Sequence, residues 1–157
     1  MKRIEFAIAF QLLLVPFQLN AEVGCIEKAY TQQEMNSCAG LDYESADSEL
    51  NRVYNEIKRV YSDEPEFLEK MKSSQLAWIK LRDADLEMYF PKEKKRFEYG
   101  SVFPMCASGI KTRITIQRIE FLKQWLKGVE EGDVCSGSVR NAWYLNKSKK
   151  NVTKVAN

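Results

Sequence analysis

The stretch Gln75-Leu76-Ala77-Trp78-Ile79-Lys80-Leu81-Arg82-Asp83 lies in the middle of the longest uninterrupted helical pattern in the chain. At 100° per residue, one stripe of this pattern faces a core, and it consists of Leu68, Met71, Gln75, Trp78, Ile79, Arg82, Leu86 and Tyr89. Gln75 and Arg82 lie on its centre line. Because a guanidinium at a core position is costly unless its donors are satisfied, the fold must bring a carboxylate, carbonyl groups or an aromatic face to Arg82. We therefore expect a structural polar network that fixes how the helices dock, in preference to a binding or catalytic role.

Residues 1–21 have the features of a secretory signal peptide. Met1-Lys2-Arg3 is a short basic lead, residues 4–19 are mostly apolar, and Ala21 supplies the small residue at which cleavage is expected. The alternative is a lipoprotein cut before Cys25, to which Glu22 is a poor fit because an aliphatic residue is preferred there. The mature chain is predicted to be periplasmic or secreted in a bacterium and to have no membrane span.

The rest of the chain is predicted to form one domain and a tail. Residues 22–138 have the length of a domain that can bury a core, and they carry 17 basic and 21 acidic side chains. Residues 139–157 carry five basic side chains and no acidic ones, and their composition predicts a mobile tail. Neither segment has the charge density expected of a nucleic-acid-binding protein.

Four cysteines, an even number in an exported chain, predict an oxidised framework. Of the three connectivities that four cysteines allow, we expect Cys25 with Cys38 and Cys106 with Cys135, because each pair flanks one local segment. A zinc site is the alternative, but the chain has no histidine and no Cys-x-x-Cys pair. No metal and no cofactor are therefore expected.

Hydrophobic periodicity and capping signals predict an all-α fold, a small bundle of about four helices stapled by disulfides. Thr31 and Glu34 form a capping box at the start of the first helix, which Gly40 is expected to interrupt. The following helices are predicted over residues 42–61, 65–90 and 108–127, and Gly128 is expected to end the last of them.

Further polar side chains lie on or beside the apolar faces of these helices. The predicted network comprises Asp47, Tyr54, Gln75, Trp78, Arg82, Asp83, Thr115 and Arg118. Asp47 and Asp83 are both candidate partners of Arg82, and the sequence leaves this choice open. The acidic group Asp83, Asp85 and Glu87 suggests the paired carboxylates of a glycosidase, but these positions spread around a helix, so we expect a solvated face instead.

Residues 91–105 break the helical periodicity and combine a basic run with aromatic residues, Gly100 and two prolines. A connection this long in a compact bundle is more often functional than a short turn. We regard it as a candidate partner-binding loop, with recognition groups on Lys94, Lys95, Arg96, Tyr99 and Ser101. The alternative is an ordinary surface loop whose Phe and Tyr side chains tuck down onto the bundle.

Taken in order, these features resemble the LprI-type lysozyme-inhibitor domain of exported bacterial proteins. The resemblance covers the chain from Cys25 to Cys135, and its motifs are Cys25 with residues 30–38, Ala46-Asp47 with Leu50-Asn51 and Tyr54, Gln75-x-x-Trp78 with Arg82-Asp83, Gly100-Ser101-Val102, and Thr115-x-x-Arg118. It implies a small, disulfide-bonded helical domain with a protein partner, which the family name identifies as a lysozyme.

Three classes of function can be compared against these residues. An inhibitor would occlude the cleft of a murein hydrolase, in which two carboxylates act on the glycosidic bond. A periplasmic binding or immunity-type module for another envelope protein or a toxin is the alternative. An enzyme is not expected, because the chain has no histidine and its cysteines are predicted to be oxidised.

Overall fold

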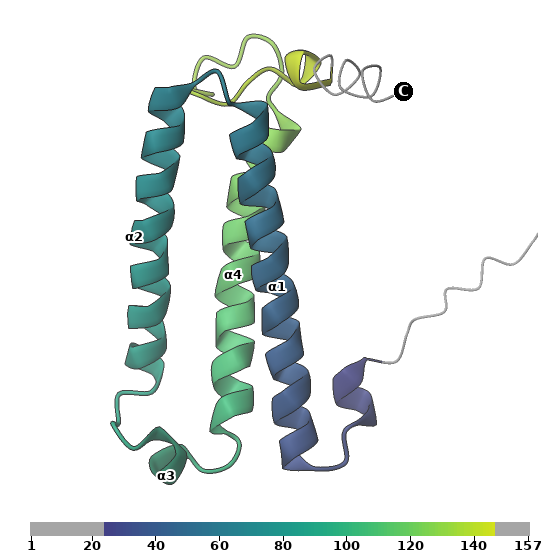
Figure 1. Cartoon of the computed structure of the whole chain (residues 1–157), viewed down its shortest axis with the longest axis vertical. Helices are drawn as coiled ribbons and strands as arrows, with labels where there is room; N and C mark the ends of the chain where they lie inside the picture. Colours follow the sequence, from purple (N-terminus) through teal and green to yellow (C-terminus); the bar gives the residue numbers. More distant parts are fainter. Residues whose placement is uncertain (1–23, 147–157) are drawn as a thin grey trace, which may run out of the picture.

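The computed structural model describes residues 24–146 and shows three long helices that run up, down and up (Figure 1). These are α1 (Gln32–Val60), α2 (Pro65–Tyr89) and α4 (Phe103–Lys127). A 3-10 turn, η1 (Cys25–Lys28), precedes α1, and a short helix, α3 (Lys95–Tyr99), connects α2 to α4. The prediction of an all-α bundle is confirmed. The predicted signal peptide lies outside the described residues, and between residues 24 and 146 no helix is both long and apolar enough to cross a membrane.

α1 is one continuous helix of 29 residues where the sequence predicted two. Its start is as predicted, since Glu34 N donates to Thr31 Oγ1 (3.2 Å) and Thr31 N donates to the Glu34 carboxylate (2.9 Å). Gly40 does not interrupt the helix. The turn that precedes it is held in place because Cys38 and Ala39 are buried, and this packing outweighs the roughly 1 kcal/mol that glycine costs a helix.

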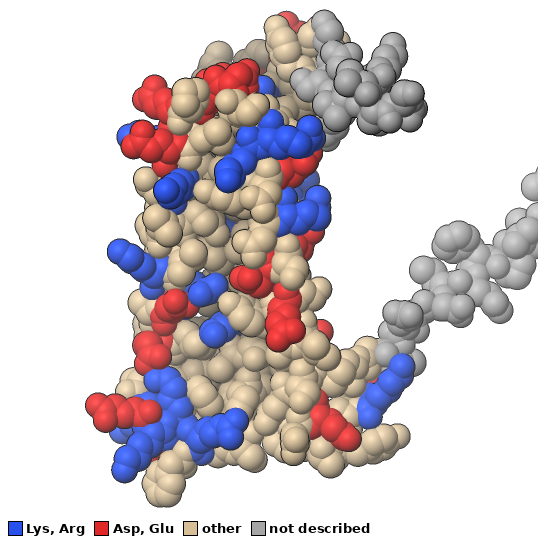
Figure 2. All heavy atoms as spheres, in the orientation of Figure 1, with Lys and Arg blue, Asp and Glu red and all other residues tan. Residues whose placement is uncertain are grey.

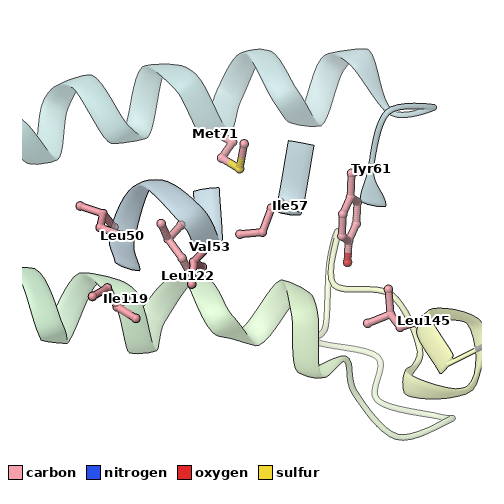
Figure 3. Close-up of a cluster of buried hydrophobic side chains, with 8 residues drawn as sticks. All are labelled: Leu50, Val53, Ile57, Tyr61, Met71, Ile119, Leu122 and Leu145. Atoms are coloured by element: carbon pink, nitrogen blue, oxygen red, sulfur yellow. The ribbon is translucent and has the colours of Figure 1, made fainter. Parts of the chain in front are cut away.

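α1 and α4 are parallel and form the closest pair of helices in the bundle (Figure 1). Their N-terminal halves bury small residues, Ala39 and Ala46 on α1 and Ala107 on α4, and small side chains let two helix backbones approach closely. Their C-terminal halves bury larger side chains, which form a core cluster with Met71 of α2 and Leu145 of the C-terminal segment. Figure 3 shows its members: Leu50, Val53, Ile57, Tyr61, Met71, Ile119, Leu122 and Leu145.

α2 lies further from this pair, and long side chains fill the space between them. Met71 is its only buried residue, while Phe67, Leu68 and Trp78 pack against the core from partly buried positions. Pro65 begins the helix as predicted. The stripe around residues 75–83 therefore faces the bundle, but as a layer of large and polar groups instead of a dry core.

Residues 128–142 fold back over the upper end of the bundle. α4 ends at Gly128, as predicted, and the φ of Gly128 is 76°, in the left-handed region that favours glycine. A Cβ at this position would lie 2.8 Å from the backbone of Ala142. The absence of a side chain at Gly128 therefore allows Val129 N to donate to Arg140 O (3.1 Å) and Ala142 N to donate to Val129 O (2.9 Å).

The predicted tail boundary at residue 139 is too early, because residues 139–146 pack onto the bundle. Arg140 donates to Val60 O (3.1 Å) and Asp63 Oδ1 (2.6 Å), and its guanidinium lies 4.5 Å from the centre of the Tyr61 ring. Leu145 is only 2% exposed. The prediction of a tail rested on polar composition, which contains no information about tertiary contacts such as these. Residues 147–157 lie outside the described part of the chain.

One of the two predicted disulfides is present. Cys25 is bonded to Cys38, with 5.5 Å between their Cα atoms, and this bond ties η1 to α1. The other predicted pair is wrong, since Cys106 and Cys135 are both free and exposed. Cys106 lies in the first turn of α4 and Cys135 lies beyond its last. A 25-residue helix rising about 1.5 Å per residue holds them much further apart than the roughly 7 Å between Cα atoms that a disulfide tolerates.

Candidate functional site

Five residues of the predicted polar network meet around the ring of Trp78. Arg82 donates to Asp83 Oδ1 (2.9 Å), and its guanidinium lies 5.3 Å from the centre of the Trp78 ring. Arg118 donates from Nε to Gln75 Oε1 (3.0 Å) and lies 5.8 Å from the centre of the same ring. Arg82 thus has two of the three kinds of partner predicted for it, a carboxylate and an aromatic face. Arg118 links α4 to α2 through Gln75 and the same ring.

The structure decides between the two candidate partners of Arg82 in favour of Asp83. Asp47 instead accepts a hydrogen bond from Asn51 Nδ2 (3.1 Å) on its own helix. The sequence missed Tyr43, whose hydroxyl accepts from Arg82 Nη1 (3.2 Å). Burial raises the pKa of Tyr43, against the opposing effect of the Arg82 charge, so this phenol stays neutral and the contact is a hydrogen bond and not an ion pair.

Two further residues of the predicted network have other roles. Tyr54 packs against the core cluster from a partly buried position. Thr115 is completely buried on α4, and its hydroxyl has no hydrogen-bond partner in the described structure. A buried hydroxyl without a partner loses its hydration and gains nothing in exchange.

We expect Thr115→Val to raise the free energy of unfolding by about 1 kcal/mol, because valine has nearly the same shape and removes the unsatisfied hydroxyl. Chemical denaturation followed by circular dichroism measures the change. Thr112→Val on the same helix is the matched control, since Thr112 Oγ1 donates to Ser108 O (2.9 Å) and no gain is expected there. A loss of stability in Thr115→Val would show that this hydroxyl is hydrogen-bonded after all.

The candidate loop ends at residue 102 instead of 105, because α4 begins at Phe103 and not near residue 108, and three aromatic rings anchor it. We call Phe90, Tyr99 and Phe103 the ring anchor. The centre of the Phe90 ring lies 5.1 Å from that of Tyr99 and 5.0 Å from that of Phe103, both with edge-to-face geometry. Tyr99 OH also accepts a hydrogen bond from Lys92 N (3.3 Å). Tyr99, predicted as a recognition group, is therefore placed as part of the support of the loop.

Polar contacts fix the loop on either side of the ring anchor. Lys95 Nζ lies 2.5 Å from Glu87 Oε2 at the end of α2. On the other side, Asn36 Nδ2 on α1 donates to the backbone oxygen of Ser101 (2.9 Å). Two more of the predicted recognition residues, Lys95 and Ser101, thus hold the loop to its neighbours.

The remaining two predicted residues, Lys94 and Arg96, face solvent together with Phe97, and we call these three residues the exposed trio. Phe97 is 85% exposed, and within the described residues neither Lys94 nor Arg96 makes an ion pair or a side-chain hydrogen bond. The sequence analysis did not include Phe97 among the recognition residues, although helical spacing predicts that it faces outward. Residues two apart differ by about 200° around a helix, so a Tyr99 that packs inward on α3 directs Phe97 outward.

The exposed trio lies beside a hollow of about 870 Å³ between α3 and the start of α1. Its walls are the amide and hydroxyl side chains of Gln32, Gln33, Asn36 and Ser37, with Arg96 and Ser101 opposite. Figure 2 shows Lys and Arg side chains gathered at this lower end of the molecule, over α3 and the adjoining end of α2. Cationic and aromatic groups on a fixed loop suit the binding of an anionic, concave partner surface. The described residues contain no group of three or more side chains placed to hold a metal ion.

Comparison with known proteins identifies relatives of this arrangement. A family model described as lysozyme inhibitor LprI matches residues 25–122, a segment that contains the disulfide, α1, α2, the loop and most of α4. An uncharacterized protein of Rhizobium meliloti (strain 1021) is 32% identical over 114 residues, which cover 66% of this chain and 79% of the relative. No solved structure matches the chain.

Proposed function

Because this chain belongs to the LprI lysozyme-inhibitor family, we propose that it inhibits a lysozyme by placing the loop of residues 91–102 in the murein-binding cleft of the enzyme. The exposed trio carries the proposal. Lys94, Arg96 and Phe97 combine two unpaired cations with an 85% exposed ring on a loop that is anchored on both sides.

The chemistry of the cleft explains why cations inhibit. A lysozyme uses one carboxylate that stays ionised and one carboxylic acid whose pKa is raised so that it can donate a proton. A Lys94 or Arg96 side chain beside the first forms a charge-assisted hydrogen bond. Beside the second, a cation favours the ionised form and lowers the pKa of the acid. The enzyme would then lack the proton that cleavage requires.

The support of the loop determines how much binding energy is retained. Ordering a mobile loop on binding consumes part of the interaction free energy, and a loop already held in its bound shape avoids that loss. Here the ring anchor, the Lys95–Glu87 pair and the Asn36–Ser101 hydrogen bond supply the order in advance. Phe97 then acts as an aromatic anchor in a sugar subsite, the kind of residue that dominates protein interfaces.

We place this encounter in the bacterial periplasm or outside the cell. Cys25–Cys38 is a structural disulfide, and such bonds persist in oxidising compartments. The predicted signal peptide supports the same location. A binding or immunity-type module for another envelope protein or toxin would use the same trio but would leave lysozymes active.

The test is a titration of the purified, oxidised protein into a murein-lysis assay with animal and bacterial lysozymes. We expect lysis to fall to the baseline at about one equivalent, because one loop fills one cleft, and we expect a one-to-one complex in size-exclusion chromatography. The protein with a reduced Cys25–Cys38 bond serves as the control for intact support of α1. Full lysis at excess protein, with no complex for any lysozyme, would contradict the proposal and favour the binding module.

A further inference from the structure

A second concave site lies between α2 and α4, in the half of the bundle away from the loop. It is a cavity of about 210 Å³ whose walls are mostly apolar: Phe67, Met71, Phe121, Leu122 and Trp125. The Trp125 ring packs against Phe67, with 5.9 Å between ring centres, and against Phe121, with 5.4 Å. Lys70, Ser74 and Arg118 supply its polar rim.

Arg118 lacks the counter-ion that the other half-buried arginines have. Arg82 pairs with Asp83 (2.8 Å) and Arg140 pairs with Asp63 (2.6 Å). Arg118 donates only to the neutral oxygens Gln75 Oε1 and Ser74 Oγ, each at 3.0 Å. Among the described residues it forms no ion pair.

The surroundings of Arg118 therefore leave its charge incompletely compensated. Its guanidinium lies 5.1 Å from the centre of the Phe121 ring, at the edge of the cavity. Burial lowers the pKa of Arg118, and no neighbouring acid opposes that effect. A guanidinium has five donors, and only two of those of Arg118 have acceptors in the described structure.

We propose that the cavity between α2 and α4 binds a small organic carboxylate, with its apolar body among Phe67, Phe121 and Trp125 and its carboxylate on Arg118. A planar guanidinium is the preferred partner of a carboxylate, and Lys70 adds a second cation on the same rim. The cavity is smaller than the roughly 300–1,000 Å³ typical of drug-sized ligands, so the ligand is a medium-chain or single-ring acid.

The position of α2 makes this cavity accessible. α2 buries only Met71, so a small displacement of α2 opens the site and leaves the α1–α4 pair intact. The site shares no residue with the exposed trio. The proposal of this site therefore does not depend on lysozyme inhibition.

Octanoate and 1-octanol distinguish a carboxylate-binding site from a cavity that binds any apolar molecule, because they share an alkyl chain and differ in charge. The readout is the NMR signal of the Trp125 indole N–H, which donates to Ser138 Oγ (3.1 Å) beside the cavity. We expect octanoate to shift this signal saturably, with a Kd at least about tenfold lower than that of octanol, because a charge-assisted hydrogen bond contributes this much or more. Equal affinities, or no saturable shift, would overturn the proposal.

Arg118→Gln tests the assigned partner. We expect it to remove the preference for octanoate while octanol binds as before. Arg113→Gln is the matched control, since Arg113 is an exposed arginine on the same helix that donates to Tyr89 OH (3.2 Å), away from the cavity. An equal loss in both variants would assign the preference to net charge alone and overturn the site. If Arg118→Gln does not fold, the comparison of the two ligands on the unmodified protein still decides.

Discussion

Leu122→Ala is expected to lower the free energy of unfolding by about 3 kcal/mol, with 5 kcal/mol as a rough upper limit. Leu122 is 2% exposed and lies where α1, α4 and Met71 of α2 meet (Figure 3). Removing its isobutyl group forfeits the transfer free energy of the buried methyl groups and leaves a cavity, because the parallel α1 and α4 cannot close over it independently. Denaturant titration of the oxidised protein measures the change.

Leu76→Ala is the matched control for this prediction. The substitution is chemically identical, but Leu76 is 53% exposed on α2, and surface substitutions of this kind stay within roughly 0.5 kcal/mol. Equal losses in the two variants would mean that α2 contributes as much to the core as α4 does, contrary to the single buried residue of α2.

The double charge reversal Lys94→Glu with Arg96→Glu is expected to weaken inhibition of lysozyme at least about a hundredfold. Each cation is proposed to form a charge-assisted contact with a cleft carboxylate, and each loss amounts to roughly a factor of ten or more. The introduced carboxylates also repel those of the enzyme. Because neither side chain has an intramolecular partner among the described residues, the stability of the protein should not change. Inhibition constants from the murein-lysis assay and denaturant titration measure the two effects separately.

Lys58→Glu with Lys80→Glu is the control for net charge. Both lysines are exposed on α1 and α2, away from the loop, and the double variant alters the charge of the protein by the same amount. We expect its inhibition constant to stay within a few-fold of the unmodified value. A comparable weakening in this control would show that long-range attraction, and not the exposed trio, governs the complex.

Helical periodicity was sufficient to predict an all-α bundle, but it did not predict correctly where one helix continues or which cysteines pair. The Thr31–Glu34 capping box, Pro65 and Gly128 mark helix ends because their chemistry is local. Gly40 gave the wrong signal, since packing of the neighbouring Cys38 and Ala39 overrides local propensity. The Cys106–Cys135 pairing failed for a different reason: cysteine spacing carries no information about the length of the helix that separates the two residues.

The candidate site was likewise predicted only in part from the sequence. Broken periodicity, length and composition singled out residues 91–105, and the loop does present exposed cationic and aromatic groups on a fixed support. Which side chains hold the loop and which face solvent depends on the five-residue helix α3, which the sequence did not predict. Arg82 has the carboxylate of Asp83 and the ring of Trp78, two of the kinds of partner predicted for it. Arg118 contacts the same ring but has no acidic partner among the described residues, and no sequence pattern indicated that.

The two ends of the bundle differ in what their residues do. At one end Gly128, Arg140 and Leu145 close the core, and at the other the ring anchor carries the exposed trio. Substitutions at residues 94, 96 and 97 touch no buried contact, so they carry almost no penalty in folding. Under the proposed function, selection for a new target could therefore act on these three positions alone, and specificity for a different lysozyme could evolve without any change in the core.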